Sequence, residues 1–427
     1  MNGATRLFLF LLLTLCAAAR SETFDLGGLY TYHYRDGRYA DWGDYARHGA
    51  RIAVAVVNDS GLLGEDRIRL RDEDMIDYHC WPDDVGRMTE TLVAKGVLAI
   101  TGADCSGPAV EIARVAARHG VPVISNGANA SALSSPGAFP WFVRVVTPSE
   151  AWEGHLIAVA ARFGIRRMAH FHTTDAWGLG AREAIHAAAT RHGIQLARTF
   201  AFPRDTSLAE LEAELRAVRD AGIRHLIMTG PTPDTVTFFR AVDALAMNRV
   251  GVTLWAAEMI SADEGPAAVR GSLGYFAPMA RLLPSPELEA FRARLETRLG
   301  HPVDPDGKAF FYGALSHDHV LAVGHGIAAA KADHGTVTRA NLMPALRTVD
   351  FRGATGRVRI SPGTNDRAAM PIRIYNSHGY GPDGRTVRFV PVGSVDPETG
   401  ALDLDRDAMR WPGGTRTPPE PEATEAP

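Results

Sequence analysis

Short apolar stretches alternate with amphipathic stretches along most of the chain, and this alternation is the strongest constraint on its fold. Residues 97–101 and 121–125 are apolar enough for buried strands, and residues 108–119 between them have the apolar spacing of a helix. Pro108 near the first turn and Gly120 after the last are residues often found at helix ends. Strands separated by helices of about 12 residues predict a doubly wound parallel sheet.

The same alternation starts again after residue 147. We expect a strand at 167–171, helices at 181–192 and 208–221, and a further strand at 223–229. A chain of 427 residues exceeds what one hydrophobic core usually holds. The chain is therefore predicted to be an α/β protein with two doubly wound, parallel-sheet lobes.

The N-terminus is typical of an export signal. Within residues 1–19, Arg6 is the only charged side chain, residues 7–15 are apolar but too short to span a bilayer, and residues 17–19 are alanines suited to cleavage. Two alternatives stay open: a short membrane anchor, and a lipid anchor at Cys16, for which the preceding leucine is a poor match. We expect a periplasmic or otherwise extracytoplasmic protein.

Charge and motifs exclude several function classes. Loss of the leader lowers Lys plus Arg from 45 to 44 and leaves Asp plus Glu at 49, so the formal net charge becomes −5. Surfaces that bind nucleic acid usually carry a basic excess, so no such partner is expected. Gly-x-Ser-x-Gly, Walker and His-Glu-x-x-His motifs are absent, which argues against an enzyme. His170 and His172 alternate on a strand without further ligands in register, so we expect neither a metal nor a cofactor.

Two cysteines remain after the leader, Cys80 and Cys105. An even pair in an exported chain predicts one disulfide, with two buried free thiols as the alternative. Cys105 also opens the run Cys105-Ser106-Gly107-Pro108 between an apolar strand and an amphipathic helix. A hydroxyl residue at such a helix start is suited to binding an anion. The pair and the run together favour an exported protein that captures a small anionic or zwitterionic molecule.

The C-terminus has a different composition. Residues 411–427 are rich in Pro, with Gly, Thr and Glu between the prolines. A segment of this composition has too few apolar side chains to bury a core. We expect residues 396–427 to form a disordered tail.

Several separate stretches resemble type I periplasmic solute-binding proteins of the branched-chain amino acid (leucine/isoleucine/valine) ABC transporter family. These stretches follow the order and spacing of the family over roughly residues 24–362: 41–44, 49–58 and 61–64, the Gly102-Ala103-Asp104-Cys105-Ser106 loop, 121–129 and 351–358. Cys80 and Cys105 stand where the family has its disulfide. The resemblance implies two α/β lobes joined by three crossovers, with the ligand between them.

The resemblance implies the following domain limits. One lobe is expected to contain residues 22–147 and 278–345, and the other residues 148–277 and 346–395. Ligand binding would close the lobes, and a membrane permease would recognise the closed form.

The resemblance also implies a carboxylate site in the first lobe. The ligand carboxylate would meet Ser106, the backbone of Ala128, and Asn129, which stands where the family usually has threonine. The alternatives are ordinary structural roles, with Ser106 as a helix cap and Asn129 as a loop cap.

The resemblance also implies contacts for the amino group and the side chain of an amino acid. By the resemblance, Glu258 would bind the ammonium group, and Trp42 and Trp177 would shape the side-chain pocket, unless both indoles are ordinary packing residues. We therefore predict a monomeric protein, without a cofactor, that captures an amino acid or a related small carboxylate or amide for an ABC permease. The alternative is a ligand sensor of the same fold with a separate signalling partner.

Overall fold

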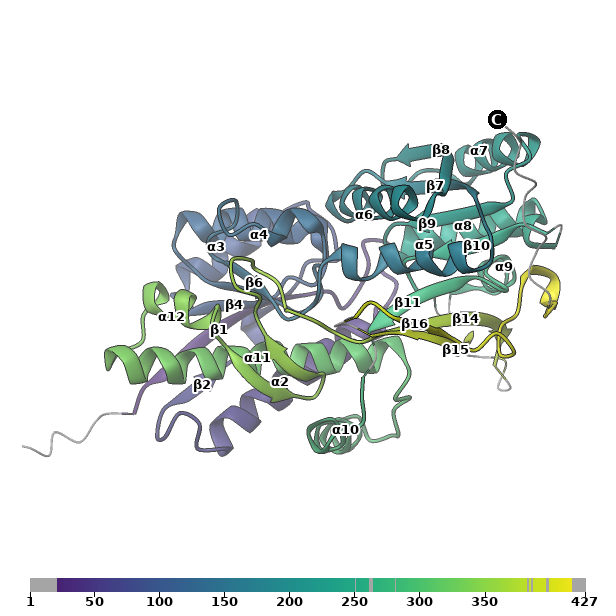
Figure 1. Cartoon of the computed structure of the whole chain (residues 1–427). Helices are drawn as coiled ribbons and strands as arrows, with labels where there is room; N and C mark the ends of the chain where they lie inside the picture. The colour runs from purple at the N-terminus through teal and green to yellow at the C-terminus, as the bar shows by residue number, and fades with distance from the viewer. Residues whose placement is uncertain are drawn as a thin grey trace, which may run out of the picture.

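The structure is a computed structural model that describes residues 21–249, 251–260, 264–280, 282–381, 384, 387–396 and 399–416. The expected leader, residues 1–19, and the lipidation site at Cys16 lie outside these residues. The described chain forms two α/β lobes that lie next to each other (Figure 1). Among the described residues, no helix has both the length and the apolar character needed to cross a membrane.

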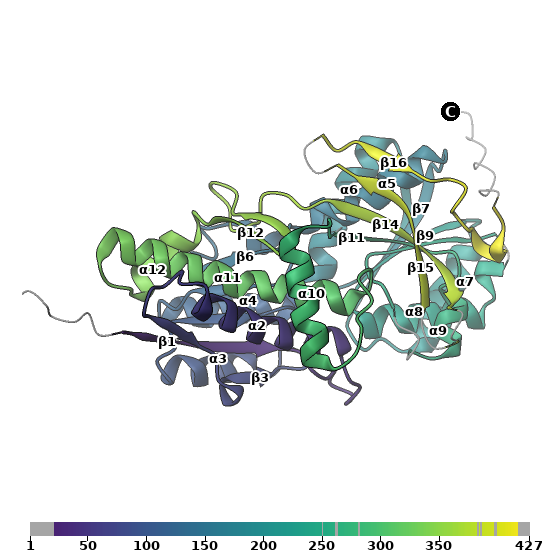
Figure 2. The ribbon, with the colours of Figure 1, turned by 90° about the horizontal axis from the view of Figure 1, so that it is seen from below.

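Lobe 1 is built on a parallel sheet with the order β2-β1-β4-β5-β6, and β3 pairs with β1. Its strands are β1 Thr23–Tyr30, β2 Arg67–Arg69, β3 Met75–Asp77, β4 Ala99–Gly102, β5 Val123–Ser125 and β6 Phe142–Arg144. Its helices are α2 Asp41–Asp59, α3 Val85–Ala94, α4 Ser106–Arg118, α10 Pro286–Leu299, α11 Lys308–His334 and α12 Arg339–Leu346. Residues from two distant parts of the sequence, 23–144 and 286–346, therefore make one lobe (Figure 2).

Lobe 2 is built on one sheet with the order β16-β15-β14-β11-β10-β9-β7-β8. The strands β7 to β11 run parallel, as predicted, and β14 to β16 extend the sheet with antiparallel pairs. The strands are β7 Arg167–Thr173, β8 Gln195–Phe202, β9 His225–Thr229, β10 Thr253–Ala256, β11 Phe276–Ala280, β14 Ile372–Tyr380, β15 Val387–Val395 and β16 Leu402–Leu404. The helices are α5 Glu153–Arg162, α6 Ala176–His192, α7 Leu208–Asp220, α8 Thr232–Ala244 and α9 Pro266–Gly271.

The domain limits differ from the expected ones in the last third of the chain. The hairpin β12–β13, Asp350–Gly353 and Gly356–Arg359, lies with lobe 1, because the buried carboxylate of Asp318 on α11 accepts N–H groups from Ala354 and Thr355 at 2.7 Å each. Residues 346–367 thus belong to lobe 1, and the chain returns to lobe 2 only before β14.

The expected disorder from residue 396 does not hold for the described part of that segment. Strand β16 pairs with β15, and Trp411 is only 2% exposed. The Trp411 ring packs against Phe163 at 4.8 Å and Phe276 at 5.0 Å between ring centroids. One buried indole thus holds a Pro-rich segment against lobe 2, while residues 417–427 lie outside the described chain.

We expect Trp411→Ala to lower the free energy of unfolding by about 3 to 5 kcal/mol, because it leaves a cavity where a large buried ring was. Chemical denaturation followed by circular dichroism measures this loss. Leu208→Ala is the control, since that side chain is 40% exposed and its removal is expected to cost about 0.5 kcal/mol or less. Equal losses in the two variants would contradict the anchoring role of Trp411.

Candidate ligand-binding cleft

One cavity is lined by both lobes, and it lies where parallel strands of both sheets end. The centre of a water molecule can move through about 80 Å³ of this cavity, so the cavity has room for a small molecule. Ligands of open α/β sheets bind outside the carboxyl ends of the strands. Lobe 1 contributes Tyr34, Trp42, Ser106, Asn129, Lys308 and Tyr312 to the walls, and lobe 2 contributes Trp177, Arg204, Thr232 and Glu258.

The first turn of α4 opens into this cavity. The helix begins at Ser106, two residues before the predicted start, and the Ala109 N–H donates to the Cys105 carbonyl at 2.9 Å. The N–H groups of Ser106 and Gly107 have no acceptor within the helix, because they belong to its first turn. The Ser106 hydroxyl accepts the Ala130 N–H at 3.1 Å, which leaves its own proton available to a ligand. The first turn of α4 therefore presents donors to the cavity, and a Cβ at Gly107 would lie 3.8 Å from the Asp175 carboxylate.

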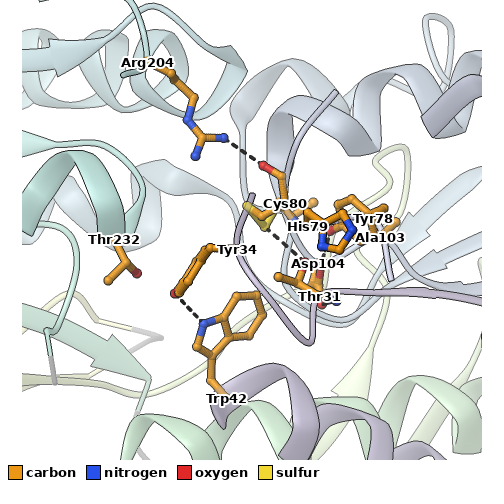
Figure 3. The surroundings of a disulfide bond; sticks show 12 residues. Thr31, Tyr34, Trp42, Tyr78, His79, Cys80, Ala103, Asp104, Arg204 and Thr232 are labelled. Atoms are coloured by element: carbon orange, nitrogen blue, oxygen red, sulfur yellow. Dashed lines mark hydrogen bonds between the residues drawn. A yellow bond between two sulfur atoms is a disulfide. The ribbon is translucent and has the colours of Figure 1, made fainter. Parts of the chain in front are cut away.

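A disulfide joins Cys80 and Cys105 immediately before α4, as predicted, so the alternative of two free thiols is wrong (Figure 3). Beside it, the buried carboxylate of Asp104 accepts hydrogen bonds from the Tyr78 hydroxyl and from the Thr31 hydroxyl at 3.1 Å. Burial raises the pKa of Asp104 to about 6 despite these donors. The loop that leads into α4 is thus held by a covalent bond and by a buried polar network.

Asn129 lines the cavity, as expected, but Ala128 does not. The Ala128 N–H donates to the Ser125 hydroxyl at 3.0 Å, and its carbonyl accepts from Arg144 at 2.9 Å. Both backbone groups of Ala128 are therefore occupied within lobe 1. The structure does not bring this predicted contact to the cavity.

Glu258 follows β10 and lines the cavity, but a cation of the chain itself already meets its carboxylate. Lys308, the first residue of α11, donates to Glu258, and Thr232 donates to the same oxygen at 3.0 Å. Burial opposes the lysine charge, yet the Glu258 carboxylate raises the pKa of Lys308 above its usual range. The ion pair joins lobe 1 to lobe 2. Sequence reasoning missed Lys308, because nothing in the local sequence places it beside a residue 50 positions away.

Both predicted tryptophans line the cavity, and each is held by a hydrogen bond. The Trp42 indole donates to the Tyr34 hydroxyl at 2.8 Å, and its ring lies 4.9 Å from that of Tyr312 between centroids (Figure 3). The Trp177 indole donates to Glu153 at 3.0 Å.

Helices α2 and α11 pack closely at Gly49, where a Cβ would lie 2.0 Å from the Gly313 carbonyl oxygen. This contact brings the first turns of the two helices together at the cavity.

Glu153 lies behind this wall and was not predicted. It begins α5, just after the chain leaves lobe 1, and it is 1% exposed. One carboxyl oxygen accepts from Trp177 of lobe 2 and from Asn129 of lobe 1 at 3.5 Å, and the other has no hydrogen-bond partner among the described residues. Burial raises the pKa of Glu153 to about 8. The sequence gives no sign that Glu153 is buried, since a glutamate in the first turn of a helix is usually exposed.

Arg204 makes a further link between the lobes, at the disulfide. Its guanidinium donates to the Cys80 carbonyl at 2.8 Å (Figure 3) and pairs with Asp234 at 3.3 Å.

Other polar residues near the cavity have structural partners. Asp175, also at the cavity, caps α6 by accepting the Gly178 N–H at 2.9 Å. His170 donates to or accepts from Thr229 at 2.9 Å within the lobe 2 sheet. Among the described residues, no group of three or more His, Cys, Asp or Glu side chains could hold a metal.

Glu153→Gln is expected to flatten the pH dependence of stability between about pH 4.5 and pH 8. The folded state keeps the Glu153 proton over this interval and the unfolded state releases it, so stability falls as pH rises, by about 1.4 kcal/mol per unit. The glutamine amide cannot ionise, so the free energy of unfolding of the variant does not fall in this way as pH rises. Thermal unfolding from pH 5 to pH 9 measures it, with Glu150→Gln, an exposed neighbour, as control. Parallel curves for wild type and Glu153→Gln would contradict the assignment.

Two α/β lobes around a shared cavity define a bilobal binding protein of periplasmic type. The chain belongs to the periplasmic binding protein family, because the family model matches residues 27–381. The resemblance and the fold inferred from the sequence are therefore confirmed.

Solved structures of two ABC transporter solute-binding proteins share this fold. One, from Rhodopseudomonas palustris HaA2 in complex with p-hydroxybenzoic acid, has a TM-score of 0.71 and 17% identity, and the match covers 88% of this chain and 97% of that one. Another, from R. palustris in complex with benzoate, has a TM-score of 0.70 and 17% identity, with 90% and 99% covered.

A curated relative is a metabotropic glutamate receptor-like protein E from Dictyostelium discoideum, 25% identical over 333 residues. The match covers 74% of this chain but only 39% of the length of that relative.

Proposed function

We propose that the protein captures a small carboxylate between its lobes outside the cytoplasm and delivers it to an ABC importer. The observation that carries this proposal is the first turn of α4, where the Ser106 hydroxyl and two backbone N–H groups open as donors into a cavity lined by both lobes. A carboxylate offers only acceptors, and the helix dipole favours its charge at this position. The benzoate and p-hydroxybenzoate held by similar folds support this ligand class.

Capture would stabilise the closed arrangement of the lobes. A ligand can shift that equilibrium only by its preference for one state. Side-chain links already cross between the lobes, among them those from Lys308 to Glu258, from Arg204 to the Cys80 carbonyl, and from Arg38 to Glu264. A ligand that contacts Ser106 on one side and Trp177 on the other would add its contacts to these only when the lobes are together.

The permease is the proposed partner, with the protein acting as an exported monomer that binds its ligand without chemical change. Family membership supports an extracytoplasmic location and a transport role. Uptake of a labelled ligand by cells that have or lack this protein tests delivery. Uptake that does not depend on the protein would count against the importer.

A sensor of the same fold is a second candidate, favoured by the receptor-like relative. In that case ligand binding would be retained while uptake is unaffected by loss of the protein. A transcriptional or motility response to the ligand that disappears with the protein would distinguish the sensor from the importer.

Ser106→Ala is expected to weaken binding of a carboxylate by about 1 to 3 kcal/mol, because a donor to the charged group is lost in a buried site. Isothermal titration calorimetry of the mature protein with benzoate and short-chain carboxylates measures the change. Ser60→Ala serves as the control, since the Ser60 hydroxyl lies at the end of α2, donates to the Val57 carbonyl, accepts the Leu62 N–H and does not line the cavity. Unchanged affinity in Ser106→Ala would remove Ser106 from the site.

A further inference from the structure

The charged groups at the cavity are already matched by other groups of the chain. Glu258 is paired with Lys308, and Arg204 is paired with Asp234. Asp104 is surrounded by hydroxyl donors, and Asp175 accepts the Gly178 N–H at the start of α6. The N–H groups at the start of α4 have no such match.

The Lys308 ammonium lies where it contacts three parts of the wall at once. It donates to Glu258, lies 3.2 Å from the Thr232 hydroxyl, and stands 5.5 Å from the centre of the Trp42 ring. An acid, a hydroxyl and an aromatic face are the surroundings that a ligand ammonium group would need. The chain itself therefore supplies the cation for this part of the cavity.

We infer that Lys308 takes the place of a ligand amino group, so that the cavity selects carboxylates without an amine beside the carboxylate and excludes α-amino acids. This inference rests on the proposed function and narrows its ligand class. An incoming ammonium group would have to displace Lys308 from Glu258 or lie beside it as a like charge, and both are unfavourable.

The walls indicate the rest of the ligand. The same cavity is lined by the rings of Trp42, Trp152, Trp177, Phe311 and Tyr312. The Trp42 and Tyr312 rings are in contact, as are those of Trp152 and Phe311 at 5.9 Å between centroids. Flat aromatic walls favour an aromatic ring, which stacks or meets them edge to face. The ligand class is therefore a carboxylic acid with a single aromatic ring.

Two ligand pairs that differ only in the amino group test this inference. The first is 3-phenylpropanoate against L-phenylalanine, and the second is 4-methylpentanoate against L-leucine. Calorimetric titration of the mature protein is expected to give at least about tenfold tighter binding of the acid within each pair. The aromatic acid should also bind more tightly than the aliphatic one. Equal or tighter binding of the amino acids would overturn the exclusion, and a preference for 4-methylpentanoate would overturn the aromatic class.

Variants of the ion pair assign the selectivity to Lys308. Lys308→Met leaves Glu258 without its cation, so the ratio of acid to amino acid affinity should fall at least about tenfold. Lys331→Met is the matched control on the same helix, because Lys331 pairs with Asp66 instead, and its ratio should equal that of the wild type. An unchanged ratio in Lys308→Met would overturn the role of Lys308.

The double variant Lys308→Met with Glu258→Gln guards against misfolding, since it removes both charges together. It should keep binding 3-phenylpropanoate and should bind L-phenylalanine more weakly than Lys308→Met does, and equal L-phenylalanine affinity in the two variants would contradict the role of Glu258. Failure of the inference is distinct from failure of the proposed function. If carboxylates bind but the pairs are not separated, the inference alone is wrong; if neither these acids nor benzoate bind, the proposed carboxylate function is wrong and the inference fails with it.

Discussion

The ion pair between Glu258 and Lys308 is the interaction on which the rest of the cleft depends. It joins a strand end of lobe 2 to the first turn of a lobe 1 helix inside a cavity lined with aromatic rings. Removal of one partner from a buried pair usually costs about 3 to 5 kcal/mol, because the other charge is left without compensation. The pair therefore stabilises the arrangement in which the two lobes are in contact. It also determines the charge that the cavity presents to a ligand.

The two sides of the cleft are held in different ways. On the lobe 1 side, the loop before α4 is fixed by the Cys80–Cys105 disulfide and by the hydrogen bonds of the buried Asp104 carboxylate. Lobe 2 approaches the disulfide through Arg204, whose guanidinium donates to the Cys80 carbonyl and pairs with Asp234. One side of the cleft is thus held by a covalent bond, and the lobes meet there through side-chain contacts that can form and break as the lobes move.

The sequence predicted the fold class and the disulfide, but not the lobe limits in the last third of the chain. The spacing of apolar residues and the lengths of the apolar segments identified the strands and helices around Ser106, because such patterns lie within one segment of the sequence. The even number of cysteines left after the leader identified the disulfide. Lys308 and Glu153 were missed for a shared reason. Their partners are 50 and 24 positions away, so their roles come from packing that no local pattern records. Trp411 was hidden in the same way, since a Pro-rich composition outweighed the one large ring that anchors it.

Glu153 and Glu258 both lie in lobe 2, and their different partners give them different roles. Glu258 pairs with Lys308 at the cavity wall and so holds a cation of the chain in place. Glu153 meets only neutral donors, so burial raises its pKa and favours the protonated form at neutral pH. An uncharged Glu153 can lie behind Asn129 and Trp177 without adding a second negative charge close to the α4 donors. An ionised Glu153 would repel a carboxylate ligand at those donors. The protonated form of Glu153 therefore favours binding of an anion there.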